Sequence, residues 1–228
     1  MIEPIVFPTG PLEVNTVIVP LVENKVLVVD PANCKFANDE DDIFGYLEKN
    51  HLEPVAIALT HGHFDHIAGL PSFKRKYDIP IAIHKNDSKM IGSDSQSEQG
   101  YALSLMGFGV FLPSVSNLPD ADCFFEDGMT LSEVYGSLPS DISAALSQWK
   151  VIHTPGHTQG CVCLYNKEQK ILISGDTVFY HSWGRTDLPG GNEAQIQKSL
   201  RRINDIVEKD TLVYPGHDFF GFELEENI

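Results

Sequence analysis

Residues 61–66 read His61-Gly62-His63-Phe64-Asp65-His66 and place four potential metal ligands within six positions. The run follows a segment over 55–60 that is rich in β-formers and predicts a buried strand, and it precedes apolar residues at helical spacing between 67 and 77. The motif therefore lies where a strand ends and a helix begins, which is the usual place for a site in an α/β protein. Four titratable side chains packed this closely are costly to bury unless a cation organises them. Imidazoles and carboxylates together favour zinc, iron or manganese over calcium or magnesium.

Three later segments repeat the same arrangement, in which an apolar strand ends in a tight turn that carries one potential ligand. They cover residues 151–160 with His157, residues 171–177 with Asp176, and residues 211–217 with His217. A glycine immediately before each of these side chains permits unusual dihedral angles and close approach of the backbone. We therefore predict that the three turns complete a metal site begun by the loop at 61–66.

A structural role is the alternative explanation for any single histidine. A lone histidine at a strand end is more often a hydrogen-bonded structural residue than a ligand, and we place His51, His84 and His153 in that group. The same explanation is poor for the motif histidines, because several histidine-bearing turns would have to follow apolar strands by coincidence.

The order HxHxDH, PGHT, GD and PGH resembles the metallo-β-lactamase superfamily of metal-dependent hydrolases, and the resemblance spans residues 30–217. The sequence GDTxF followed by GRTDLPGG at 184–191 is similar to the short glyoxalase II-like (hydroxyacylglutathione hydrolase-like) members. This resemblance implies an α/β fold, an αβ/βα sandwich of two mixed β-sheets flanked by helices, with the metals along one edge of the sheets.

The resemblance also implies two divalent metal ions per chain, with zinc favoured and iron or manganese as alternatives. It assigns one ion to His61, His63 and His157, the other to Asp65, His66 and His217, and a bridging position to Asp176. A hydroxide that bridges the ions would be the nucleophile. Asp65 would have a second, catalytic role, because its free oxygen can orient that hydroxide.

A thioester such as S-lactoylglutathione, or a related small ester, is the substrate class that the resemblance implies. A thiol with a pKa of ~8.5 leaves as thiolate without a dedicated general acid. Arg185 is the one basic residue that the motif places beside the site, so it is a candidate for binding substrate, and an ion pair with Asp187 is an equally good explanation. Asp30 and Thr60 are candidates for hydrogen bonds that orient a ligand loop, although Asp30 is also explained as a turn residue before Pro31.

Two other functions are compatible with the motifs. Persulfide dioxygenases share the fold and much of the motif set, and they would use a single iron at His61, His157 and Asp176. A non-catalytic metal-binding protein is the third alternative, and it is disfavoured because every ligand position is intact. Metal stoichiometry and oxygen uptake separate the first two alternatives.

Composition and charge exclude several classes of partner. The chain has 228 residues and a formal net charge of −16, with 16 basic and 32 acidic residues, so nucleic-acid binding is disfavoured. We expect no signal peptide, no membrane contact, a cytoplasmic location and four reduced cysteines, with Cys161 and Cys163 as small core residues. The expected partner is a small-molecule ester or thioester. The oligomeric state stays open, with a homodimer as one alternative.

The metal motifs run from residue 61 to residue 217, so we predict a single domain over residues 1–228. The pattern predicts strands over 14–20, 24–30, 79–83, 149–153, 160–166, 170–174 and a final strand over 211–214, and helices over 39–51 and 192–208.

Residues 85–148 look longer than the corresponding connection in the short glyoxalase II-like enzymes, and we interpret them as containing an insertion. We expect residues 93–100 to be polar and mobile, and the apolar residues 101–112 to cover the metal cleft or a subunit interface rather than the core. As a lid, they would replace the glutathione-binding helical domain that full-length glyoxalase II carries and that we expect this chain to lack. Deletion of 93–112 would then leave folding nearly intact.

Overall fold

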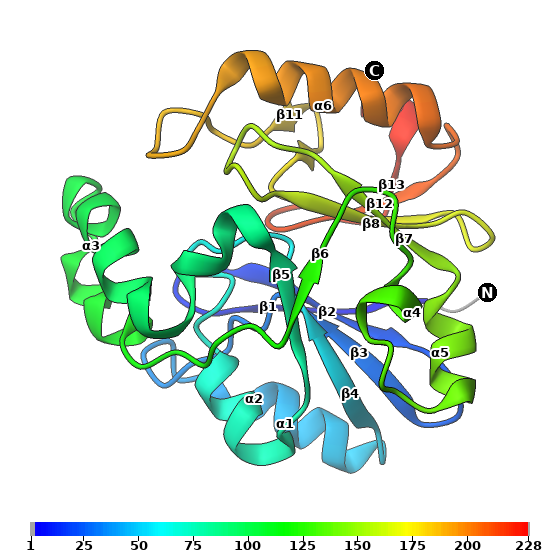
Figure 1. Ribbon diagram of the computed structural model, residues 1–228, viewed down its shortest axis with the longest axis horizontal. Helices are drawn as coiled ribbons and strands as arrows, with labels where there is room; N and C mark the ends of the chain where they lie inside the picture. Colours follow the sequence, from blue (N-terminus) through cyan, green and yellow to red (C-terminus); the bar gives the residue numbers. More distant parts are fainter. Residues whose placement is uncertain (1–2, 228) are drawn as a thin grey trace.

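The computed structural model describes residues 3–227, and its two sheets lie face to face between outer helices (Figure 1). The first sheet has the order β1-β2-β3-β4-β5-β6, with β1 at Ile5–Thr9, β2 at Val14–Pro20, β3 at Lys25–Val29, β4 at Glu53–Ala58, β5 at Ile81–His84 and β6 at Cys123–Phe125. The second has the order β13-β12-β9-β8-β7, with β7 at Trp149–His153, β8 at Val162–Asn166, β9 at Ile171–Gly175, β12 at Leu212–Pro215 and β13 at Phe222–Glu223. Strands β10 (Val178–Phe179) and β11 (Ser182–Trp183) form a separate ribbon.

Helices cover the outer face of each sheet. Helices α1 (Glu40–Lys49) and α2 (Leu70–Tyr77) pack on the first sheet, and α6 (Glu193–Ile206) packs on the second. The connections carry α3 at Ser95–Leu105, α4 at Leu131–Val134, α5 at Ser140–Leu146, and the 3₁₀ turns η1 at Lys85–Met90, η2 at Gly92–Asp94, η3 at Gly109–Val115 and η4 at Leu224–Asn227. The arrangement is the expected αβ/βα sandwich.

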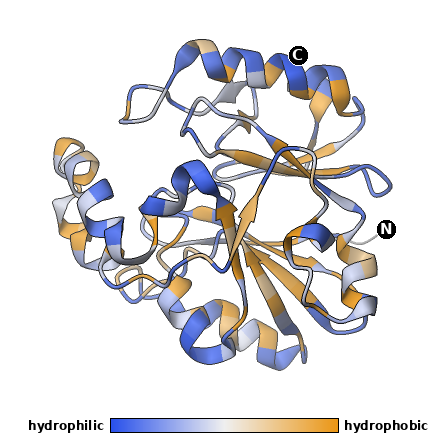
Figure 2. Ribbon diagram, viewed as in Figure 1, coloured by the Kyte–Doolittle hydropathy of each residue, from blue (hydrophilic) through white to orange (hydrophobic). Residues whose placement is uncertain are grey.

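The hydrophobic core forms three layers because each sheet is apolar on both faces (Figure 2). Side chains such as Leu27 and Ile173 meet between the two sheets. Alternate residues of the same strands, such as Val28 and Leu172, face the outer helices instead. This double burial explains why the central strands appear in the sequence as continuous apolar runs rather than alternating ones.

Most of the predicted elements are confirmed, and the differences lie at short edge elements. The strand over 211–214 is not the final one, because β13 pairs antiparallel with β12 beyond it. The strand predicted over 160–166 begins only at Val162, so Cys161 precedes it, although Cys161 and Cys163 are both buried as expected. No helix within residues 3–227 is long and apolar enough to cross a membrane.

One expectation for residues 93–112 needs correction. The polar stretch 93–100 forms part of η2 and the first turns of α3. The apolar stretch that follows does contribute to the core, contrary to expectation, since Leu103 and Phe111 are buried in the layer on the outer face of the first sheet. Met106 and Phe108 instead line a cavity beside the predicted metal ligands, and Tyr101, Leu105 and Val110 are exposed.

Candidate metal centre

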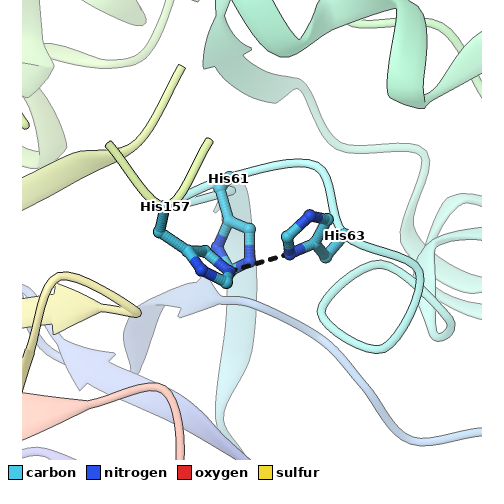
Figure 3. Close-up of side chains that lie close together, drawn as sticks. All are labelled: His61, His63 and His157. Carbon is cyan, nitrogen blue, oxygen red and sulfur yellow. Dashed lines mark hydrogen bonds between the residues drawn. The ribbon is translucent and has the colours of Figure 1, made fainter. Parts of the chain in front are cut away.

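The loop that follows β4 brings its four titratable side chains to the edge of the two sheets. His61 and His66 are fully buried, Asp65 is nearly so, and His63 is partly exposed. Potential donor atoms form three groups, each with its atoms within 4.8 Å of one another. The groups are His61, His63 and His157; Asp65, His66 and His217; and Asp30, His61 and His66. Figure 3 shows the three imidazoles of the first group converging, two from the loop after β4 and His157 from the turn after β7.

Asp176 lies between the first two groups. One of its carboxylate oxygens is 3.4 Å from His66 Nε2, and the other is 3.4 Å from His157 Nε2 and 3.8 Å from His217 Nε2. Asp65 is 3.3 Å from His217 Nε2 through its Oδ2 atom. The structure therefore brings all seven predicted ligands together, and the carboxylate predicted to bridge reaches histidines of both groups.

The donor atoms fit a divalent cation. His61 Nε2 is buried without a hydrogen-bond partner among the described residues, and an unpaired buried polar atom is unfavourable unless something binds it. Facing imidazole nitrogens also approach closely, at 2.8 Å between His157 Nε2 and His63 Nδ1. A β-carbon at Gly216 would collide with Asp176 and His66, so the glycine before His217 is required for this close approach.

Burial and mutual electrostatics act differently on four of the imidazoles: the pKa values of His61 and His63 are lowered, whereas carboxylates outweigh burial and raise those of His66 and His217. Burial and the neighbouring His157 lower the pKa of His63 to about 3, and burial with His66 lowers the pKa of His61 well below its usual value. These imidazoles are therefore neutral, as a metal requires. For Asp176, burial acts to raise the pKa, but His66 and the other histidines outweigh it and lower the pKa well below the usual range.

Hydrogen bonds orient the imidazoles toward one another. Asp30 Oδ1 accepts from the Thr60 backbone N–H at 2.7 Å, and Asp30 Oδ2 accepts from the Thr60 hydroxyl at 2.6 Å and from His66 Nδ1 at 2.9 Å. His157 Nδ1 donates to the Arg185 carbonyl at 2.7 Å. These bonds leave the Nε2 atoms of His66 and His157 directed at the site. Of the two explanations for Asp30, the structure supports the orienting one.

Two further residues hold the ligand loops and were not predicted. Asp87, which is 2% exposed, accepts from the Thr158 hydroxyl at 2.6 Å and the Gly62 N–H at 3.2 Å, so it joins the loops of His61 and His157. Asn15 Nδ2 donates to the carbonyls of Pro215 and Asp218, each at 3.1 Å, on either side of His217. Neither residue lies in a recognisable motif, so only the three-dimensional arrangement reveals these roles.

A cavity of about 270 Å³ opens beside the ligands. Its lining consists of Leu12, His63, Phe64, Asp65, Met106, Phe108, His157, Asp176, Phe179, Arg185, Leu188, His217 and Asp218. Arg185 thus lies at the cavity as predicted, but its guanidinium also forms a two-point ion pair with Asp187, with both N–O distances at 2.7 Å. His84 and His153 lie outside the site and stack on each other.

Comparison with known proteins gives consistent matches. The sequence profile of the metallo-beta-lactamase superfamily matches residues 9–217. The probable metallo-hydrolase YqgX of Bacillus subtilis is 30% identical over 92% of this chain and 87% of its own length. A hydroxyacylglutathione hydrolase of Pelagibacter ubique is 27% identical over 89% of this chain and 65% of its own length.

Solved structures are similar over nearly the whole chain. The BLEG-1 B3 metallo-beta-lactamase gives a TM-score of 0.78 at 25% identity and covers 99% of this chain and 95% of its own. TTHA1623 in a di-iron-bound form gives a TM-score of 0.72 at 27% identity and covers 99% of this chain and 96% of its own.

Proposed function

The chain belongs to the metallo-beta-lactamase superfamily, and from this premise we propose that it is a dinuclear metal-dependent hydrolase of thioesters or related small esters. The position of Asp176 carries the proposal, because its carboxylate lies between two complete groups of ligands. A single-metal site would need only one of those groups.

The seven clustered side chains suit two ions. His61, His63 and His157 would hold one ion, Asp65, His66 and His217 the other, and Asp176 both. When bound, such a pair supplies a water of lowered pKa as the nucleophile and a Lewis acid for the substrate carbonyl. Asp65 would accept a hydrogen bond from that water. Zinc is favoured, and the di-iron form of TTHA1623 is a reason to test iron beside it.

The lining of the cavity suits a substrate with a good leaving group. In hydrolysis the acyl carbon–sulfur bond breaks and a carbon–oxygen bond to water forms, which gives a carboxylate, a thiol and one proton released to solvent. Apart from the predicted ligands, Arg185 and Asp218 are the only titratable side chains among the described residues that line the cavity, so few groups there are free to act as a general acid. A thiolate needs no such acid, because a thiol has a pKa of ~8.5, whereas an amine leaving group does need one.

Metal analysis combined with two assays tests the proposal. The protein is loaded separately with zinc, iron and manganese, and metal content is measured beside thiol release from S-lactoylglutathione and simple acyl thioesters. We expect two ions per chain and metal-dependent thiol release. One iron per chain with oxygen uptake on glutathione persulfide would support a persulfide dioxygenase instead. Two bound ions without hydrolysis of any thioester or ester would contradict the proposed activity.

A further inference from the structure

We propose that the cavity beside the ligands is an acyl-chain pocket, so that the enzyme selects thioesters by an apolar acyl group and not by a charged leaving group. This inference rests on the proposed function, which it makes more specific.

The apolar side chains of the lining come from widely separated parts of the chain. They are Leu12 before β2, Phe64 in the metal loop, Met106 and Phe108 between α3 and η3, Phe179 in β10, and Leu188 before α6. An apolar wall next to a cluster of polar groups is typical of a pocket that binds the apolar part of a ligand. The volume of about 270 Å³ is at the small end of such pockets, which limits the acyl group to a short or medium chain.

The wall formed by Met106 and Phe108 is fixed to the metal loop. Phe108 lies 6.0 Å from Phe64 and 5.7 Å from Phe111 between ring centroids, and Phe64 stacks on Phe111 at 5.2 Å. Phe64 is the direct neighbour of two predicted ligands, so this aromatic group places the wall against the reacting carbonyl. The segment that carries the wall directly follows α3, which stands at the left of the molecule (Figure 1).

Charge on the lining disfavours recognition of an anionic leaving group. Arg185 is the only lysine or arginine among the described residues of the lining, and Asp187 already binds its guanidinium at two points. Asp218 adds a carboxylate to the same lining. A substrate carboxylate, such as those of glutathione, would therefore meet a guanidinium whose charge Asp187 already balances and whose Nε and one Nη are already used.

The test is a series of straight-chain thioesters of the neutral thiol N-acetylcysteamine, from acetyl to decanoyl, hydrolysed by the metal-loaded protein. We expect kcat/KM to rise about 4-fold for each methylene buried, until the pocket is full, and then to fall. Met106→Ala should move the optimum to longer chains, and Met106→Trp should move it to shorter ones. Leu105→Ala and Leu105→Trp are the matched controls, because Leu105 is 62% exposed and lies outside the lining.

A second readout does not depend on turnover. Analogues in which a methylene replaces the sulfur cannot be hydrolysed, and calorimetry measures their binding to the same five proteins. The affinity for these analogues should depend on acyl-chain length in the same way as kcat/KM does. Only the Met106 variants should have their optimal chain length shifted.

These measurements separate the two proposals. A graded binding series without hydrolysis of any thioester would contradict the proposed function and leave the pocket supported. Binding that does not change with chain length, or equal responses of the Met106 and Leu105 variants, would overturn the pocket even if thioesters are hydrolysed. Hydrolysis of butanoyl-glutathione more than about 100-fold faster than of the neutral thioester would overturn the claim about the leaving group.

Discussion

Asp176 connects the two groups of ligands, so its removal should affect both ions. We expect Asp176→Ala to bind less than one ion per chain and to lose more than about 100-fold in activity, because every ligand of a pair contributes to the shared geometry. His61→Ala should chiefly empty one position. Elemental analysis and turnover of each variant check this, with Asp205→Ala, which is exposed on α6 away from the cavity, as a carboxylate control. Two ions and normal turnover in Asp176→Ala would contradict the bridging role.

Asp87 should contribute to stability as well as to metal affinity. Burial raises the pKa of its carboxyl, although hydrogen bonds from Thr158 and Gly62 oppose that effect. Asp87→Ala would remove the acceptor of both donors and should lower the free energy of unfolding by about 1–3 kcal/mol. Urea denaturation measures this loss, and the exposed Asp94→Ala in the same connection should show almost none. Equal stability of the two variants would show that Asp87 does not hold the loops.

Some residues of the site could be identified from sequence motifs, and others only from the folded structure. His61 and the other predicted ligands lie in motifs with a fixed spacing, so the sequence alone could group them, and their role stays a prediction until metal is measured. Asp87 accepts a hydrogen bond from Thr158, which lies 71 positions further along the chain. Asn15 donates one to the carbonyl of Asp218, which lies 203 positions further along. No local pattern marks such partners, because the folded chain alone brings them together.

At the scale of elements, strands and helices with a strong apolar pattern were predictable, and elements without one were not. The central strands and α6 have strong apolar patterns over their whole length. β13 has two residues, and α3 has its apolar residues spread around the helix, so neither has a usable periodicity. Leu103 and Phe111 face the core, and deletion of 93–112 would therefore remove core packing together with the cavity wall.

The stacked pair of His84 and His153 connects the ends of β5 and β7, one strand from each sheet, and should make stability depend on pH. Their ring centroids are 4.1 Å apart with an angle of 8°, and burial together with His153 lowers the pKa of His84 to about 4. The unfolded chain binds a proton at His84 near pH ~6.5. The folded state binds this proton only near pH 4. The free energy of unfolding should therefore fall as the pH drops from ~6.5 to about 4.

Replacement of His84 tests this dependence. The loss in free energy of unfolding between pH 7.5 and pH 5.0 should be about 1 kcal/mol smaller in His84→Phe than in the natural protein. His51→Asn is the control, because His51 is exposed and asparagine tolerates its left-handed backbone, with φ at 55°. Equal losses in all three proteins would contradict the lowered pKa of His84.

At the scale of the whole molecule, bound ions would cross-link the two sheets. The loop after β4 in the first sheet supplies four of the ligands, and the turns after β7, β9 and β12 in the second sheet supply the others. A ligand that binds only the folded state stabilises it by about 2.7 kcal/mol per site at 100-fold excess over Kd, which corresponds to roughly 5–10 °C for each ion in a chain of this size. Scanning calorimetry should show that the melting temperature falls by this amount when a chelator removes the metal, and that it recovers when metal is added back. Asp176→Ala should not respond.

The bonds from Asn15 to the turn around His217 also determine when the site can exist. They join residues 200 and 203 positions apart, and contacts of such high sequence separation form slowly because a long segment must close first. On the ribosome the amino-terminal hairpin emerges long before residue 217 has been translated. A nascent chain therefore has the side chains of His61, His63 and His157 available while the group of Asp65, His66 and His217 is incomplete, and full loading of the proposed site would follow the release of β12 from the ribosome.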